Sequence, residues 1–303
     1  MRIFDLHCDT ALELYTQKEI LNDNTLAISL DKGKDFEKWN QVFAIWIPDN
    51  IRGEAAYNYY FGAYNNFLNE IKLNQNEISI WNSSDADTRV KAIMAVEGGA
   101  VLGGNIHLLD KLNGQGIKII TLTWNGENEI GFGADENRPL KPFGREVVSK
   151  MEQLDMIVDV SHLSEAGFCD VVEISKKPFI ASHSNAYSIC KHRRNLKNHQ
   201  IEEIIHRKGL IGLNFYWEFV TEKQCNFSGF DELFAHVDHF LSMGAEDVLC
   251  LGSDFDGAQP IKSLDDFSKM SDLYNFLLRK NYSEHLVDKI FFDNANCFFS
   301  VHK

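Results

Sequence analysis

Residues 156–182 read MIVDVSHLSEAGFCDVVEISKKPFIAS, and this stretch contains the pattern that decides the fold. The apolar, largely β-branched run 156–160 predicts a short buried strand. Residues 165–174 have the apolar spacing of a helix, and the run 179–182 predicts a second strand. Parallel strands need a crossover of this kind, so the stretch predicts a βαβ unit.

The same alternation recurs along the whole chain. Strands are predicted by eight short apolar runs, at residues 3–6, 42–47, 92–96, 117–123, 156–160, 179–182, 210–215 and 248–252. Helices are expected at 55–71, 106–112, 144–154, 165–174, 198–207 and 230–243, with closing helices at 267–279 and 283–293. Eight repeats of strand and helix predict an α/β fold, a (β/α)₈ TIM barrel, with an open doubly wound sheet as the alternative.

Composition and charge narrow the class of protein. The chain has 303 residues, of which 44% are hydrophobic and 24% charged, as in globular proteins with a large core. No linker or internal repeat divides it, so we expect one domain over residues 1–303, with residues 9–41 as an insertion. A net charge of −14 disfavours nucleic acid and anionic lipid as partners.

Targeting and cysteine patterns point to a cytoplasmic protein without a membrane partner. The first residues are too acidic for a signal peptide, and no apolar run reaches the roughly 18 residues of a spanning helix. The six cysteines are scattered and form no C-x-x-C pair. This spacing argues against a zinc ribbon and against a dense disulfide framework.

Polar residues accumulate where the predicted strands end. In the first strand, Asp5, His7 and Asp9 alternate with the apolar Phe4 and Leu6, so the strand should have a polar and an apolar face. We expect the apolar face to meet the helices, which leaves His7 and Asp9 pointing together into the mouth of the barrel. Their spacing suits two ligands of one metal ion.

Four further ionisable residues end other predicted strands: Glu97, His162, His183 and Asp254. The carboxyl ends of barrel strands are where active sites are built. Buried charges without a shared partner would each cost several kcal/mol, and a cation removes that cost. Three histidines with two or three carboxylates exceed the roughly four ligands of one zinc ion, so they suit a two-metal site, with zinc favoured over manganese, iron or cobalt.

Several motifs together resemble the membrane (renal) dipeptidase family of zinc metallopeptidases, which has an amidohydrolase-like metal barrel. The motifs occur in family order over almost the whole chain: DLHCDT (5–10), AVEGG (95–99), LTWNG (122–126), FGREVV (143–148), DVSHLS (159–164), SHSNAY (182–187), RRN (193–195) and GSDFDG (252–257). No single motif is specific, but the ordered set is. The resemblance implies a hydrolase that acts on peptide bonds.

The resemblance also implies a role for each strand-end residue. His7 and Asp9 would bind one zinc ion, His162 and His183 a second, and Glu97 would bridge the two. It places the metal site at the carboxyl ends of the strands, as the positions of these residues also do.

Two more residues complete the implied chemistry. Asp254 would accept and donate a proton for a metal-bridging hydroxide, and Arg194 would hold the terminal carboxylate of the substrate. The implied function is a zinc-dependent dipeptidase for L-L dipeptides, with L-D dipeptides left open as further substrates. The alternative is a binuclear metal amidohydrolase for another small carboxylate-bearing amide, such as an N-acyl amino acid or a lactam. Small dipeptides are the expected partners, and a homodimer stays open.

The chain departs from the family pattern at two positions. Trp124 stands where characterised animal enzymes have a histidine, and an indole has no basic nitrogen to carry a proton. Asn125 or Asn128 could supply the oxyanion contact instead. Phe219 stands where family members can present a tyrosine hydroxyl. These four residues are the remaining candidates for contact with substrate.

Two other residue patterns have a simpler interpretation. His236 and His239 have helical i, i+3 spacing, which predicts an exposed helix face rather than a metal site. Cys8 has the wrong parity to join its neighbours as a ligand and is expected in the core. A barrel without catalytic activity, kept as a binding protein, is disfavoured because every expected metal ligand is present.

Overall fold

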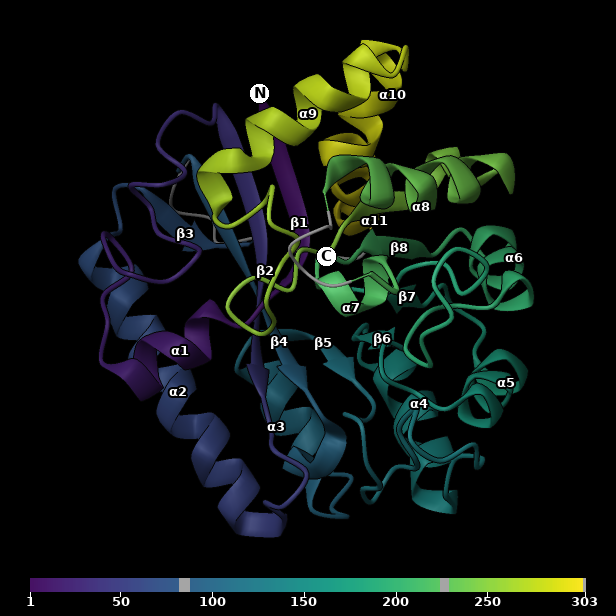
Figure 1. Ribbon diagram of the computed structural model, residues 1–303. Helices are drawn as coiled ribbons and strands as arrows, with labels where there is room; N and C mark the ends of the chain where they lie inside the picture. Colours follow the sequence, from purple (N-terminus) through teal and green to yellow (C-terminus); the bar gives the residue numbers. More distant parts are fainter. Residues whose placement is uncertain (82–87, 224–228, 302–303) are drawn as a thin grey trace.

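The strands of the computed structural model, which describes residues 1–81, 88–223 and 229–301, form a closed ring (Figure 1). Around the ring the parallel strands are β1 (Arg2–Cys8), β2 (Lys38–Trp46), β4 (Val90–Glu97), β5 (Ile117–Thr121), β6 (Ile157–Asp159), β7 (Ile180–Ala181), β8 (Leu210–Leu213) and β9 (Leu249–Leu251). Pairing of β1 with β9 and of β2 with β4 closes the ring. The prediction of a (β/α)₈ barrel is confirmed, and the open sheet is wrong.

A further short strand, β3 (Ile78–Ile80), lies outside the ring and was not predicted. It pairs in parallel with the first residues of β4, Val90 to Ala92. The partner on that side of β4 changes along the strand, because β5 pairs with β4 only from Met94 onward. The backbone N–H and C=O groups at the start of β4, on the side that β5 does not reach, therefore pair with β3.

Helices surround the ring and follow the strands in the predicted order (Figure 1). They are α1 (Thr10–Gln17), α2 (Gly53–Leu73), α3 (Leu108–Gly114), α4 (Pro142–Gln153), α5 (Glu165–Ile174), α6 (Asn198–His206), α7 (Trp217–Val220), α8 (Phe230–Ser242), α9 (Met270–Arg279), α10 (Glu284–Asp288) and α11 (Asn294–Val301). Local sequence sets the start of α5, where the Ser164 hydroxyl accepts a hydrogen bond from the Gly167 N–H. The insertion at 9–41 holds α1.

The hydrophobic core has an inner and an outer part. The inner cluster takes at least one buried side chain from every strand of the ring, including Phe4, Ile93 and Cys250. Phe299 of α11 stacks on Phe4 with ring centroids 5.0 Å apart, so α11 packs at the amino end of β1. The outer cluster joins the alternate strand residues to the helices. The carboxyl ends of the strands are thus the end left for a site.

The faces of β1 differ from the expectation. Phe4 and Leu6 belong to the inner cluster, so they point into the barrel and not toward the helices. Asp5 lies on the outer face, where its carboxylate accepts a hydrogen bond from the amide of Gln41 on β2 at 2.8 Å. A shift of register between Asp5 and Cys8 breaks the alternation, and Cys8 packs in the outer core as predicted. The alternation of side chains between the two faces of a strand cannot be extrapolated across such an irregularity.

Other expectations concern cysteines and membranes. The five described cysteines are free, and Cys225 lies outside the described residues. No helix within residues 1–81, 88–223 and 229–301 is both long and apolar enough to cross a membrane.

Candidate metal centre

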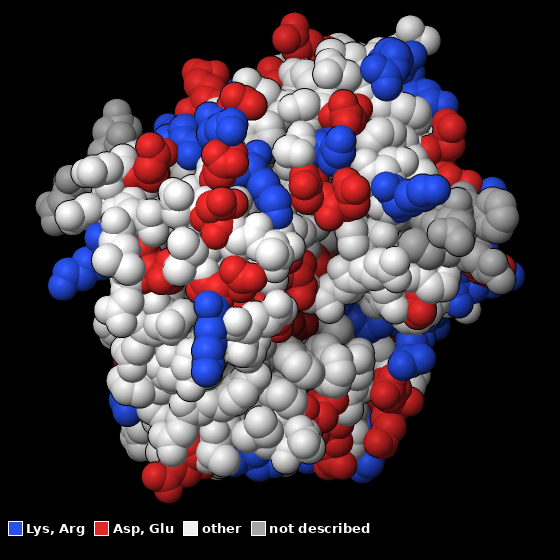
Figure 2. All heavy atoms as spheres, turned by 60° about the vertical axis from the view of Figure 1, so that its left-hand side comes forward, with Lys and Arg blue, Asp and Glu red and all other residues white. Residues whose placement is uncertain are grey.

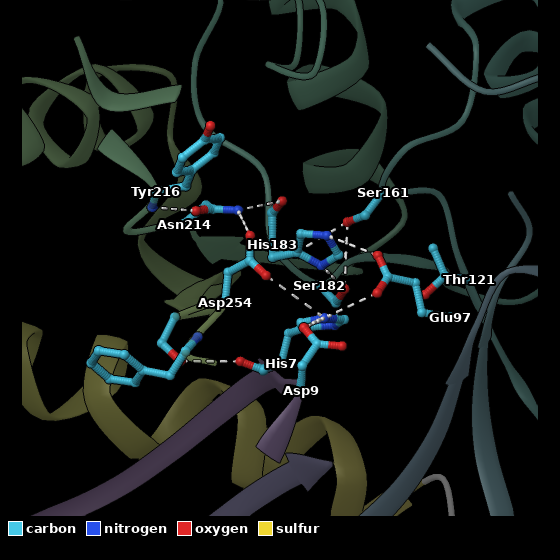
Figure 3. Close-up of polar contacts among 12 residues, drawn as sticks. His7, Asp9, Glu97, Thr121, Ser161, Ser182, His183, Asn214, Tyr216 and Asp254 are labelled. Carbon is cyan, nitrogen blue, oxygen red and sulfur yellow. Dashed lines mark hydrogen bonds and ion pairs between the residues drawn. The ribbon is translucent and has the colours of Figure 1, made fainter. Parts of the chain in front are cut away.

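The six predicted strand-end residues converge at one end of the barrel, and Figure 3 labels five of them, all except His162. His7 lies near the end of β1, Glu97 is the last residue of β4, and Asp254 follows β9. The other members are Asp9, His162 and His183. All six side chains are buried or nearly so.

Glu97 lies in the middle of the group and divides it into two halves. Its Oε1 atom is 2.9 Å from Nε2 of His162 and 3.6 Å from Nε2 of His183. Its Oε2 atom is 3.5 Å from Nε2 of His7. One carboxylate oxygen thus faces each half, as a bridging ligand requires (Figure 3).

The two histidines of one half face each other through their Nε2 atoms, which are 2.9 Å apart. Ser182 Oγ donates to the carboxylate of Asp159 at 2.6 Å, so it accepts from Nδ1–H of His183 at 2.8 Å. Nδ1–H of His162 likewise donates to Oδ1 of Asn125 at 2.9 Å. Both Nε2 atoms therefore carry lone pairs that point together, which is repulsive unless a cation lies between them.

The other half contains polar atoms without hydrogen-bond partners. These are Nε2 of His7 and Oδ1 of Asp9, both fully buried. Nε2 of His7 is 3.4 Å from Oδ2 of Asp9. A Cβ on Gly257 would lie 2.0 Å from that same oxygen, so glycine keeps the space beside the carboxylate open.

Burial sets the protonation of these groups. It raises the pKa of Asp9 to about 7 and that of Asp254 to about 6, because a buried carboxylate is poorly solvated. Burial, helped by the positive charge of Arg194, lowers the pKa of His162 to about 4, so its imidazole is neutral. Burial also lowers the pKa of His183, whereas the charges of Glu97 and Asp9 raise the pKa of His7. Crowded carboxylates beside imidazoles are the donor set of a divalent cation such as zinc.

The backbone holds two of these residues in an uncommon conformation. His162 and Asp254 have φ angles of 67° and 61°, in the left-handed region. Non-glycine residues pay about 1–2 kcal/mol there, so surrounding contacts must hold them. Asp254 is held by the Asn214 amide, which donates to its Oδ2 at 3.0 Å, and by its own N–H, which donates to the carbonyl of His7 at 3.1 Å.

A cavity of about 570 Å³ opens over the metal centre. Trp124 and Asn125 line this cavity. The Trp124 ring stands edge-on to the Trp46 ring, with the ring centroids 4.8 Å apart. Asn128 is not among the lining residues. Its amide instead fixes its own loop, donating to the carbonyl of Leu122 and accepting from the N–H of Ile130.

Arg194 is a buried cation with open donors beside the site. Its side-chain atoms Nε and Nη2 have no hydrogen-bond partner, and burial lowers its pKa to about 10. The guanidinium carbon lies 5.3 Å from the ring centroid of Phe219, which lines the first cavity. Arg194 itself lines a second cavity of about 310 Å³. Phe219 therefore supports the guanidinium rather than offering a polar group.

Several lining residues were not predicted from the sequence, among them Tyr216, Trp46 and Glu13. Tyr216 and Trp46 lie at or just beyond the ends of β8 and β2, so the strand-end criterion that found the histidines could also have found them. Their aromatic side chains are not metal ligands, so the search for ligand residues did not indicate them.

One prediction about the other histidines is wrong. His236 is fully buried, because its Nδ1 accepts from the N–H of Ala186 at 3.1 Å and its Nε2–H donates to the carbonyl of Val220 at 2.9 Å. His239 is partly exposed and contacts Asn198. A buried histidine that bridges two backbone segments resembles a surface residue in sequence alone.

The profile of the membrane dipeptidase family (peptidase family M19) matches residues 1–299. The chain belongs to this family. Among curated relatives, an uncharacterized dipeptidase of Schizosaccharomyces pombe is 30% identical over 217 residues, and a dipeptidase of Claviceps purpurea is 32% identical over 204 residues. These alignments cover 69% and 66% of this chain but only 51% and 48% of the relatives, so the chain spans about half of their length.

A solved structure of similar length extends the comparison. A metallopeptidase from Rhodobacter sphaeroides, bound to a phosphinate mimic of the dipeptide L-Ala-D-Ala, superposes with a TM-score of 0.92 at 25% identity. The match covers 100% of this chain and 98% of that one. A probable dipeptidase from Pseudomonas aeruginosa, at 17% identity and a TM-score of 0.87, shares the fold.

Proposed function

We propose that residues 1–303 act as one zinc-dependent dipeptidase domain with two zinc ions. The observation that carries the proposal is the arrangement of Glu97, with one carboxylate oxygen toward His7 and the other toward His162 and His183. When bound, the two ions would polarise the substrate carbonyl and lower the pKa of a water molecule. The solved relative with a dipeptide mimic supports small peptides, L-D dipeptides included, as substrates.

Asp254 is the residue proposed to move the proton. Its carboxylate lies beside the metal ligands, with Oδ1 4.0 Å from Nε2 of His7. A pKa of about 6 suits a group that must both accept and release a proton near neutral pH. Asn214 occupies only Oδ2, which leaves Oδ1 to face the reacting atoms.

Arg194 is proposed to bind the terminal carboxylate of the substrate. Its unpartnered, buried Nε and Nη2 atoms can form two parallel hydrogen bonds with a carboxylate. An additional residue would move that carboxylate by roughly 3.5 Å, beyond an oriented salt bridge. We therefore expect dipeptides to be cleaved far better than tripeptides or dipeptide amides.

Metal analysis combined with two variants tests the proposal. Glu97→Gln should lose metal from both positions, because the bridging carboxylate serves both.

Asp254→Asn should keep the metals and lose about 10²–10⁴-fold in kcat, the usual range for general acid–base catalysis. Glu146→Gln, an exposed residue of α4, is the control and should match the wild type.

The contradicting outcomes are specific. A fully active enzyme with one ion per chain would overturn the two-metal proposal, and metal loss in Asp254→Asn would make Asp254 a ligand. Equal cleavage of a dipeptide and its C-terminal amide would remove Arg194 from its role. Activity on N-acyl amino acids or lactams in place of dipeptides would favour the wider amidohydrolase function.

A further inference from the structure

The charged side chains that line the 570 Å³ cavity are all acidic. They are Asp9, Glu13, Glu97, Glu218, Asp254 and Asp256. No lysine or arginine of the described residues lines this cavity. Figure 2, turned toward the side of α1 and α2, shows acidic side chains gathered over the middle of that face, some set back in a hollow. The site is therefore built to attract cationic groups.

Only two of these carboxylates are available to a ligand. Asp9, Glu97 and Asp254 belong to the metal centre. Asp256 is occupied by the Thr10 hydroxyl and the Ala27 N–H, both at 2.6 Å. Glu13 and Glu218 remain, and within the described ranges neither forms an ion pair with a lysine or arginine. Within the described ranges the hydrogen bonds of the Glu13 carboxylate come from its own helix, from the Gln17 amide at 2.6 Å and the Thr16 hydroxyl at 3.3 Å.

The order of strands around the ring places these two residues at different ends of the cavity. Arg194 follows β7, and the strand directly across the ring from β7 is β2, with β1 beside it. Trp46 ends β2, and Glu13 lies on α1, which follows β1 at once. Glu218 lies on α7 after β8, next to β7. Glu13 and Trp46 thus come from the side of the ring opposite β7, while Glu218 comes from the connection beside it.

The orientation of a bound dipeptide follows from the proposed function, on which this inference rests. With its carboxylate at Arg194 and its scissile carbonyl at the metal centre, the dipeptide directs its first side chain toward β1 and β2. Trp46 and Glu13 are lining residues of the cavity that come from this side of the ring. An aliphatic stem packs on an indole, and a terminal cation is stabilised by the ring and by the carboxylate.

We propose that Glu13, together with Trp46, selects dipeptides whose first residue carries a cationic side chain, lysine or arginine. Glu13 supplies the charge that recognises the end of that side chain, and Trp46 supplies the wall along its stem. This specificity concerns the first residue only, since Arg194 recognises the second through its carboxylate.

The test compares substrates that differ only in this charge. We would measure kcat/KM for lysyl-alanine, norleucyl-alanine and glutamyl-alanine with the metal-loaded enzyme. Lysyl-alanine should exceed norleucyl-alanine by about fivefold, the upper range for one partly exposed ion pair, and glutamyl-alanine should be poorest. Glu13→Gln should remove the preference for lysyl-alanine while norleucyl-alanine stays unchanged. Glu13→Lys should reverse the order and favour glutamyl-alanine.

Glu218→Gln is the matched variant from the other end of the cavity, and it should keep the lysyl preference. Loss of that preference in Glu218→Gln instead of Glu13→Gln would overturn the proposal. So would an equal loss for lysyl- and norleucyl-alanine in Glu13→Gln, because Glu13 would then bind the α-amino group. Equal cleavage of these two substrates by the wild type defeats this inference alone. If neither is cleaved, the proposed dipeptidase function fails as well.

Discussion

Two buried carboxylates, Asp5 and Asp159, tie neighbouring strands in the same manner on opposite strands of the ring. Asp5 of β1 accepts hydrogen bonds from the N–H and the hydroxyl of Ser253, at 2.8 and 2.6 Å. Asp159 of β6 accepts from the N–H and the hydroxyl of Ser182, at 2.9 and 2.6 Å. Each serine directly precedes a residue of the metal centre. We call these groups the Asp5 cluster (Asp5, Ser253) and the Asp159 cluster (Asp159, Ser182).

The clusters differ in what the serine hydroxyl contacts next. Ser182 Oγ accepts from Nδ1–H of His183, so the Asp159 cluster decides which ring nitrogen of His183 carries the proton. Ser253 Oγ instead contacts main-chain groups, the carbonyl of His7 at 3.1 Å and the N–H of Phe255 at 3.2 Å. The same carboxylate–serine pattern therefore prepares a ligand atom in one place and fixes only the backbone in the other.

The largest expected effect is that of Asp159→Asn. The carboxamide cannot accept from all four donors that Asp159 serves, which include the hydroxyls of Thr121 and Ser182. The His183 tautomer is then no longer fixed, and affinity for the metal proposed to bind His183 should fall about 10–100-fold. Competition with a chelator measures this. Asp5→Asn is the matched variant, and an equal loss of affinity there would break the comparison.

His236, a buried histidine outside the metal centre, sharpens the comparison of the two clusters because it also joins two backbone segments. Burial lowers the pKa of His236 to about 4, so below about pH 6.5 the unfolded chain binds a proton that the folded chain does not. Stability should be full above pH 6.5 and fall by up to about 3 kcal/mol as the pH drops to 4. His236→Gln should remove this part of the pH dependence in urea titrations. The metal content of this variant should stay unchanged. A changed metal content would show that the buried hydrogen bonds of His236 affect the metal centre without contacting it.

The Asp5 cluster should contribute to stability alone. Asp5→Asn leaves a buried amide facing donors from Ser253 and Gln41, and such a mismatch costs about 1–3 kcal/mol. Chemical denaturation should report this loss, while zinc analysis should still find the wild-type content. A stability equal to that of the wild type would mean that the strands are held without this carboxylate.

The smallest expected effects come from the serines. Ser182→Ala and Ser253→Ala each remove one hydroxyl, at a cost of about 1 kcal/mol of stability. Only Ser182→Ala should also weaken metal binding, by a few-fold, because only Ser182 contacts a ligand ring. Parallel unfolding and metal titrations separate the two effects. Equal metal affinity in both variants would show that the serine–histidine contact has no influence.

The barrel and the polar strand ends could be predicted because each depends on short-range pattern. Glu97, His162, His183 and Asp254 follow apolar runs whose length and spacing are visible in the chain, and parallel strands bring their ends together. The orientation of β1 could not be predicted in this way, since a shift of register after Asp5 changes which side chains face inward.

Other features depend on partners far apart in the sequence. His236 is buried because Ala186 and Val220 meet it, and Glu218 and Glu13 face one cavity although many residues separate them. No local pattern in the chain encodes these pairings. They follow from how loops after different strands pack over the end of the ring.

The sequence by itself determined the alternation of strands and helices, the family and the set of metal-ligand candidates, because periodicity and ordered motifs are properties of the chain. Only the tertiary structure decided that Glu97 divides the ligands into two halves and that Ser182 connects Asp159 to His183. Hydrogen bonds and shared ligands depend on distances of about 3 Å between atoms, and closure of the ring sets those distances.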